Sequence, residues 1–218
     1  SSSCTVYGQA DSMPINESFP LKKAESPYGE SKKMCEEILK KLNNSKHSFK
    51  NITLRYFNPI GAHPTGLIGE LPIGTPENLV PYITQTAVGK RDFLSVFGDN
   101  YKTKDGTCIR DYINIMDLAE VHIACLEKLI AVEDENFFKI YNVGTGKGTS
   151  VFELINLFEN VNDIKLNYKI GDRRKGDVIS AYADTTKIKE ELSWSTKYSL
   201  ENALKSAWNW ELNLNKDE

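Results

Sequence analysis

The heptapeptide SPYGESK at residues 26–32 places the strongest constraint on the fold, because it predicts the start of a long helix. Serine is a favourable N-cap residue, and proline suits the first helical position, where no amide donor is lost. Long or apolar side chains then recur at spacings of three and four residues, at Tyr28, Lys32, Cys35, Leu39 and Leu42. We therefore expect a helix from residue 27 to about residue 44.

Tyr28 and Lys32 lie one turn apart on this expected helix, so the ammonium group comes close to the phenol. A nearby cation favours the phenolate form of a tyrosine, and a phenolate is a general base for an alcohol or sugar hydroxyl. In a chain with 10 tyrosines, about one Tyr-x-x-x-Lys is expected by chance. A packed tyrosine beside a solvated lysine therefore stays the alternative until the flanking sequence is considered.

Segments with strand and helix patterns alternate on both sides of this helix. Residues 1–8 (SSSCTVYG) indicate the end of a strand, and residues 9–25 indicate a long surface loop. Residues 51–58 (NITLRYFN) indicate a buried strand. We expect further strands at 137–143 and 165–170, a strand and then a helix within 112–130, and helices near 80–90, 150–160 and 199–210. Ligands bind at the carboxyl ends of strands in open α/β sheets, which draws attention to residues 1–8.

The composition excludes several classes of partner. With 218 residues, 40% of them hydrophobic and 26% charged, the chain resembles ordinary globular proteins. A net charge of −3 gives no electrostatic reason to expect nucleic acid or a membrane as partner, and no apolar run is long enough to span a membrane. The four cysteines form no Cys-x-x-Cys pair and no metal-ligand cluster with the three histidines. A reducing, cytoplasmic setting without a metal site is therefore expected.

A series of sequence blocks gives these patterns a context. It consists of Ser3, VYG at 6–8, YGESK at 28–32, LRYFNP at 54–59, GAHPTGLIGE at 61–70, NLVPY at 78–82, FG at 97–98, DGTCIRDY at 105–112, MDLA at 116–119, YNVG at 141–144 and RRKGD at 173–177. In content and order this series resembles the extended short-chain dehydrogenase/reductases, and among them it is most similar to the UDP-glucose (UDP-galactose) 4-epimerases. The resemblance extends over nearly the whole chain.

The resemblance implies an α/β fold made of the C-terminal part of a Rossmann-type, doubly wound parallel sheet and a smaller α/β substrate-binding domain. Residues 1–58 are expected to be the remaining part of the NAD-binding domain, with 112–130 returning to it, and residues 59–218 to be the UDP-sugar-binding domain. The Gly-rich NAD loop with which the family begins is not found in the sequence. Gly144, Gly146 and Gly148 fail the Gly-x-Gly-x-x-Gly spacing, so they are expected to form a turn and a helix cap. We therefore expect the chain to be a fragment that is inactive alone, with a homodimeric parent enzyme.

The resemblance also assigns roles to individual residues. Tyr28 would take the proton from the 4-hydroxyl of a UDP-hexose, with NAD as cofactor, and a 4-keto sugar would form transiently. Catalytic and cofactor-binding roles are implied for Ser3, Tyr28 and Lys32, and a cofactor contact for Phe57. Substrate-binding roles are implied for Asn58, Asn78, Leu79, Ser95, Val96, Phe97, Arg110, Arg174, Asp177 and Ala181. Structural or solvated roles are expected for Arg55, Arg91 and Arg173.

Two positions depart from related enzymes. Cys4 and Thr5 occupy positions that are acidic in the related dehydratases, so dehydration is disfavoured. Ala181 stands where epimerases restricted to unsubstituted hexoses carry a bulky tyrosine, which leaves room for an N-acetyl group. Another UDP-sugar enzyme, such as a UDP-glucuronate epimerase, and a non-catalytic nucleotide-sugar-binding module stay open as alternatives.

Overall fold

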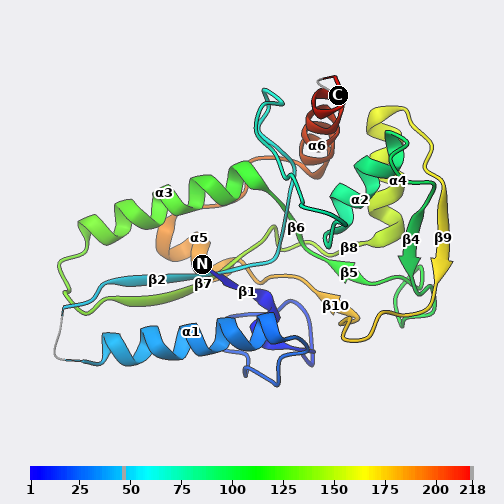
Figure 1. Ribbon diagram of the computed structural model, residues 1–218. Coiled ribbons are helices and arrows are strands. Elements are labelled where there is room, and N and C mark those ends of the chain that lie inside the picture. Colours follow the sequence, from blue (N-terminus) through cyan, green and yellow to red (C-terminus); the bar gives the residue numbers. More distant parts are fainter. Residues whose placement is uncertain (46–47, 217–218) are drawn as a thin grey trace.

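The computed structural model describes residues 1–45 and 48–216 and contains parallel sheets flanked by helices (Figure 1). In chain order the elements are β1 (Ser2–Ser3), η1 (Cys4–Tyr7), α1 (Pro27–Asn43), β2 (Asn51–Tyr56), β3 (Asn58–Ile60), α2 (Leu79–Ala87), β4 (Leu94–Phe97), β5 (Ile109–Arg110), β6 (Tyr112–Asn114), α3 (Ile115–Ala131), β7 (Phe138–Val143), β8 (Thr149–Ser150), α4 (Val151–Asn162), β9 (Tyr168–Gly171), β10 (Ser180–Ala181), α5 (Thr186–Leu192) and α6 (Leu200–Leu214).

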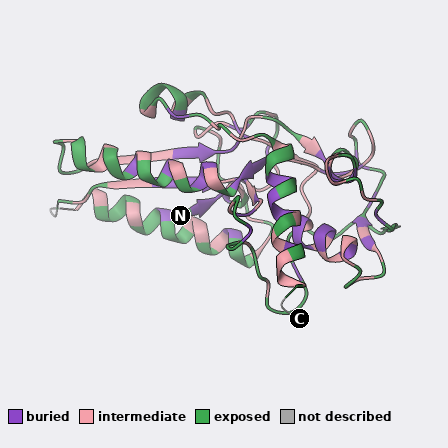
Figure 2. Cartoon of the chain, turned by 90° about the horizontal axis from the view of Figure 1, so that it is seen from above, coloured by how far each residue is buried: buried purple, intermediate pink, exposed green. Residues whose placement is uncertain are grey.

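The first layer of the fold is a parallel sheet in the order β1-β2-β7. Its faces are covered by α1 on one side and α3 on the other, as Figure 1 shows. Neighbouring side chains of β2 point to opposite faces: Leu54 packs in a cluster with Val121 and Cys125 of α3, whereas Arg55 binds Glu36 of α1. Burial is concentrated in these strands (Figure 2). The expected Rossmann-type parallel sheet is confirmed.

The packing of α1 differs from the expectation. Ser26 caps the helix by accepting a hydrogen bond from the Gly29 amide at 3.1 Å, as predicted. The predicted stripe, however, is largely open to solvent, since Tyr28 is 55% and Leu42 46% exposed. Among the residues of this helix, Gly29 and Glu36 are the buried ones. The inward face of α1 is therefore set by a glycine and a carboxylate, which hydrophobic periodicity does not detect.

The second layer holds a separate core. Its buried members come from β3, α2, β4, β6, α4 and α6, and include Ile83, Leu154, Phe158 and Leu204. The last helix, α6, contributes Leu204 and Ala207 to this core. Short strand pairs connect this core to the first sheet: β3 pairs with β6, and β5 lies between β10 and β8.

Two boundaries in the structure refine the sequence picture. The expected strand 51–58 is interrupted at Phe57, because β2 belongs to the first sheet and β3 pairs with β6 instead. Residues 138–143, in the range assigned to the second domain, form β7, which runs parallel to β2 from Asn51↔Phe138 to Tyr56↔Val143.

Among the helices in the described ranges, none has the length and apolar character needed to cross a membrane.

Candidate active site

Tyr28 and Lys32 lie at the start of α1, and α1 packs against β1, the strand that ends at Ser3. The Lys32 ammonium lies 5.6 Å from the centre of the Tyr28 ring, so the predicted proximity of the two side chains is present. Lys32 also donates a hydrogen bond of 3.1 Å to the Ser1 carbonyl, which ties the helix to the strand that carries Ser3. The Tyr28 ring is accessible from outside, as a proton-transfer group must be.

Ser3 is held so that its own proton is available. The Thr5 amide and the Thr5 hydroxyl both donate to Ser3 Oγ, at 3.2 and 3.0 Å. A hydroxyl that accepts two hydrogen bonds can still donate one. The neighbouring Cys4 is a poor acid, because burial raises the pKa of its thiol to about 12 even though Arg110 acts in the opposite direction. The structure therefore offers Ser3, and not Cys4, as a proton donor here.

Phe57, Asn58 and Ala181 lie where the chain passes from β2 into the second layer. Phe57 is buried, and it belongs to the same apolar cluster as Ala181 and Val6. The Asn58 amide donates to the Asp111 carbonyl at 2.9 Å, whereas its buried side-chain oxygen Oδ1 has no hydrogen-bond partner. An unpaired buried oxygen is costly, so this side chain is suited to receive a donor from a ligand.

Arg110, Arg174 and Asp177 form a charged group beside Phe97. Arg174 Nη2 lies 3.0 Å from Asp177 Oδ1, and Arg110 Nη2 lies 3.7 Å from the same oxygen. The Arg174 guanidinium is also 5.8 Å from the centre of the Phe97 ring. Two planar cations and an exposed aromatic face are the groups that a nucleoside diphosphate requires. The tertiary structure thus assembles four of the predicted substrate residues.

The other predicted substrate residues are spread around this group. Asn78 is exposed and donates to Glu70 Oε1 at 2.8 Å, and Leu79 begins α2. In β4 the Val96 side chain is buried in the second core, whereas Phe97 is exposed. Ser95, like Phe97, alternates with Val96 along the strand and so points to the opposite face. Ser95 and Phe97 are therefore better placed than the Val96 side chain to meet a ligand.

Asp111, the residue after Arg110, was not assigned a role from the sequence, although it joins three segments of the chain. Its buried carboxylate accepts hydrogen bonds from the Thr145 amide, the Thr145 hydroxyl, the Gly146 amide and the Ala183 amide, at 2.6–3.1 Å. Burial raises the pKa of this carboxyl, and the hydrogen bonds act against that rise. Because its partners lie 34 or more residues away, no local pattern in the sequence could have indicated this role.

The same carboxylate decides what the turn after β7 can do. A Cβ on Gly144 would lie 2.4 Å from Asp111 Oδ2, so the turn closes tightly around a protein carboxylate. The Thr145 and Gly146 amides, which a phosphate would need, already donate to Asp111. The following Ser150 and Glu153 form a capping box at the start of α4. The turn-and-cap interpretation of residues 144–150 is confirmed.

These side chains fit one half of a dinucleotide cofactor. Tyr28, Lys32 and Ser3 supply a phenol, an ammonium group and a hydroxyl around the end of β1, which suits a nicotinamide riboside. In the turn 144–148, the Thr145 and Gly146 amides already donate to Asp111, so they are not available to a pyrophosphate.

The chain is similar to several known proteins. The "UDP-glucose 4-epimerase" of Bacillus subtilis is 48% identical over 211 residues, which are 97% of this chain and 61% of that protein. A structure of UDP-glucose 4-epimerase from Stenotrophomonas maltophilia with bound NAD and formylated UDP-arabinopyranose covers 100% of this chain and superposes with a TM-score of 0.95 at 40% identity. This chain covers 63% of that structure.

A second structure, the Bifidobacterium longum enzyme in complex with NAD⁺ and UDP, gives a TM-score of 0.93 at 40% identity, with 100% of this chain and 64% of that one covered. The chain thus spans a little over three fifths of the length of these relatives. The sequence model of the family described as GDP-mannose 4,6 dehydratase matches residues 1–207. From this match over nearly its whole length, together with the shared fold, it follows that the chain belongs to that family.

Proposed function

We propose that the protein acts as an NAD-dependent UDP-glucose 4-epimerase, which interconverts UDP-glucose and UDP-galactose through a 4-keto sugar. The observation that carries this proposal is the closeness of Tyr28 and Lys32 at the start of α1, where Lys32 is bonded to the segment that leads into Ser3. The identity to UDP-glucose 4-epimerases over 97% of the chain supports the same reaction. Although the family is named after a dehydratase, the position next to Ser3 holds Cys4, whose raised pKa makes it unsuited to acid–base work.

In this proposal Tyr28, as phenolate, takes the proton from the sugar 4-hydroxyl. Lys32 stabilises the phenolate from one helical turn away, at the distance the structure gives. Ser3 donates to the sugar 4-oxygen, because its own oxygen is already occupied by the two hydrogen bonds from Thr5. Bound NAD would supply the hydride chemistry at C4 of the sugar.

The charged group is proposed to hold the UDP portion. Arg110 and Arg174 bind the diphosphate, and Asp177, which they share in the structure, accepts a hydrogen bond from a ribose hydroxyl. The Asn58 side chain accepts a hydrogen bond from the substrate through its unpaired Oδ1. Ser95, Val96 and Phe97 frame the uracil. Asn78 and Leu79 contact the phosphate and sugar groups. Phe57 is proposed to line the cofactor site.

Ala181 is proposed to widen the hexose pocket for an N-acetyl group, so that UDP-GlcNAc and UDP-GalNAc are also substrates. Ala181 is the register partner of Arg110 across β10 and β5, and it shares a cluster with Phe57. Its place between a proposed phosphate ligand and a proposed cofactor contact supports this assignment.

A second copy of the chain is the proposed partner, giving a homodimer with α1 at the contact. Met34 and Ile38 are 56% and 58% exposed on that helix, which is more apolar surface than a solvated helix needs. Ile38→Glu should convert a dimer to a monomer in light scattering. A cytoplasmic location is also proposed, since all four cysteines are free thiols.

The test of the proposed reaction is conversion of UDP-galactose to UDP-glucose by the natural full-length polypeptide with NAD. The wild-type protein should turn over, and Tyr28→Phe should bind UDP with unchanged affinity but lose activity by about 10²–10⁴-fold. UDP binding without turnover in the wild type would favour the non-catalytic module. Turnover of UDP-glucuronate and not of UDP-galactose would favour the glucuronate epimerase.

A further inference from the structure

A buried ion pair joins α1 to the first sheet beneath the proton-transfer residues. Arg55 of β2 and Glu36 of α1 are 3% and 5% exposed. Arg55 Nε lies 2.9 Å from Glu36 Oε1, and Arg55 Nη2 lies 2.6 Å from Glu36 Oε2, so the contact is bidentate. Burial lowers the pKa of Arg55, but the hydrogen bonds and charge interactions with Glu36 and Tyr7 together leave the pKa raised. Arg55 is therefore charged, and the bidentate contact gives the pair a defined geometry.

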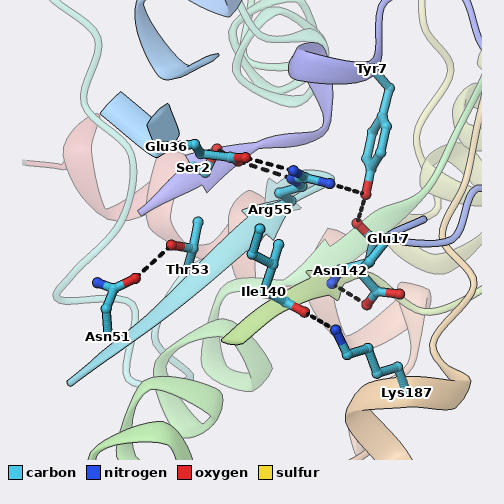
Figure 3. A network of polar contacts seen from close by, with 10 residues as sticks. All are labelled: Ser2, Tyr7, Glu17, Glu36, Asn51, Thr53, Arg55, Ile140, Asn142 and Lys187. Atoms are coloured by element: carbon cyan, nitrogen blue, oxygen red, sulfur yellow. Dashed lines mark hydrogen bonds and ion pairs between the residues drawn. The ribbon is translucent and has the colours of Figure 1, made fainter. Parts of the chain in front are cut away.

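The same pair is bonded to both sides of Ser3 (Figure 3). Before it in the chain, Ser2 Oγ donates to Glu36 Oε1 at 2.5 Å. After it, Arg55 Nη1 donates to the Tyr7 hydroxyl at 2.8 Å, and the guanidinium lies 4.8 Å from the centre of the Tyr7 ring. The segment that carries Ser3 and the helix that carries Tyr28 and Lys32 are thus both bonded to the Arg55–Glu36 pair.

The network continues away from the pair into β7. The Tyr7 hydroxyl donates to Asn142 Oδ1 at 2.7 Å, and Asn142 Nδ2 donates to the Ile15 carbonyl at 2.8 Å. The Asn142 amide donates to Glu17 Oε1 at 2.7 Å. Each strand of the first sheet therefore contributes a side chain to the network, which makes the sheet a rigid reference for Arg55.

The composition of the α1 interface gives this pair its importance. Glu36 follows Lys32 by four residues and Tyr28 by eight, so the three side chains lie along one side of the helix. Apart from Glu36, the buried residue of this helix is Gly29, which has no side chain to interlock with the sheet. A helix held by apolar packing would be fixed by several interdigitated side chains. Here the rotation of α1 about its axis depends mainly on polar contacts, among which the Glu36–Arg55 pair is buried.

We infer that Glu36 and Arg55 are positioning residues: they set the rotation of α1 and so hold Tyr28 and Lys32 in register with Ser3. The inference rests on the proposed function for the chemistry of those three residues. It predicts that the pair can be replaced without loss of the fold, but with loss of the catalytic step. A misplacement of about 1 Å in a catalytic group can lower a rate about 10²-fold.

The test replaces both members at once, as Glu36→Met/Arg55→Met. Exchanging a buried ion pair for apolar residues of similar size leaves no unpaired charge and is often neutral for stability. Glu37→Met, on the next and exposed residue of α1, is the matched control. In the natural full-length polypeptide, the double variant should keep the thermal midpoint, the KM and the affinity for UDP, while kcat falls about 10²-fold.

A second readout does not depend on activity. Amide hydrogen exchange should become faster along α1 in the double variant and stay unchanged along α3, because α3 has its own apolar contacts. A kcat equal to that of Glu37→Met would overturn the inference, and so would unchanged exchange along α1. Should the double variant fail to fold, Arg55→Lys takes its place, since it keeps the charge and loses the bidentate fork. For Arg55→Lys a kcat equal to the control again overturns the inference.

Failure of the proposed function would look different. Wild-type protein without turnover of any UDP-sugar would refute the epimerase, and it would leave the exchange comparison to decide on the positioning pair alone. Faster exchange of α1 would then support the structural role of the pair, and unchanged exchange would overturn it.

Discussion

Ser150 performs two tasks at the start of α4, and its removal should therefore cost more than an ordinary helix cap. Its Oγ accepts from the Glu153 amide at 3.0 Å, while Glu153 Oε2 accepts from the Ser150 amide at 2.9 Å. The same hydroxyl donates to Asp105 Oδ2. Ser150 is 4% exposed, so water does not replace these contacts easily.

The magnitude follows from the two tasks. Loss of the cap in Ser150→Ala costs about 1 kcal/mol. Loss of the hydrogen bond to a half-buried carboxylate costs about 1–2 kcal/mol more. The free energy of unfolding should thus fall by about 2–3 kcal/mol at pH 7, as measured by urea unfolding followed by circular dichroism. Ser199→Ala is the matched control, since Ser199 forms the same capping box with Asn202 but is exposed, and it should cost about 1 kcal/mol.

The pH dependence separates the two tasks. Burial raises the pKa of Asp105, but the hydrogen bonds from Ser150 and Thr107 outweigh it and leave the pKa lowered. A lowered carboxyl pKa gives stability that is present above the unfolded value of about 3.9 and is lost as the pH falls through the folded value. The penalty of Ser150→Ala should therefore shrink toward the capping contribution below about pH 4. Equal penalties for Ser150→Ala and Ser199→Ala at pH 7, or a Ser150→Ala penalty that stays constant from pH 7 to pH 3, would refute this reasoning.

Three further predictions concern the site and its support. Ala181→Tyr should abolish turnover of UDP-N-acetylhexosamines and leave UDP-galactose turnover in place; equal loss of both, or no loss of either, in a coupled assay would contradict the proposed pocket. Gly144→Ala should lower the free energy of unfolding by about 1–3 kcal/mol, because the new Cβ would lie 2.4 Å from Asp111 Oδ2 and the turn must shift. An unchanged midpoint of urea unfolding would contradict this prediction. Arg174→Ala should weaken UDP binding about tenfold or more in calorimetry with kcat nearly retained, because one charge-assisted contact to the diphosphate is lost, whereas an unchanged affinity would remove Arg174 from the site.

Local patterns were sufficient for several elements. Ser26 and Pro27 marked the start of α1, which begins at Pro27 as expected, and the strand expected at 137–143 is present at 138–143. Such features are decided within a few residues, by caps, by proline and by runs of β-branched and aromatic side chains. The closeness of Tyr28 and Lys32 belongs to the same class, because one helical turn fixes it.

Only the tertiary structure decided which face of α1 is inside and how the site is assembled. Hydrophobic periodicity favoured Tyr28, Leu39 and Leu42, yet Gly29 and Glu36 are buried, because the partner of Glu36 is a charged residue of β2. Asp111 joins Arg110 to a turn more than thirty residues away, and the pair Arg110–Arg174 depends on a shared Asp177. A charge or a glycine has no periodic signature, and its energetic contribution depends on which group the rest of the fold brings against it. The sequence by itself thus determined the start of α1, the strand at β7 and the closeness of Tyr28 and Lys32, and the packing of distant segments decided the orientation in which they act.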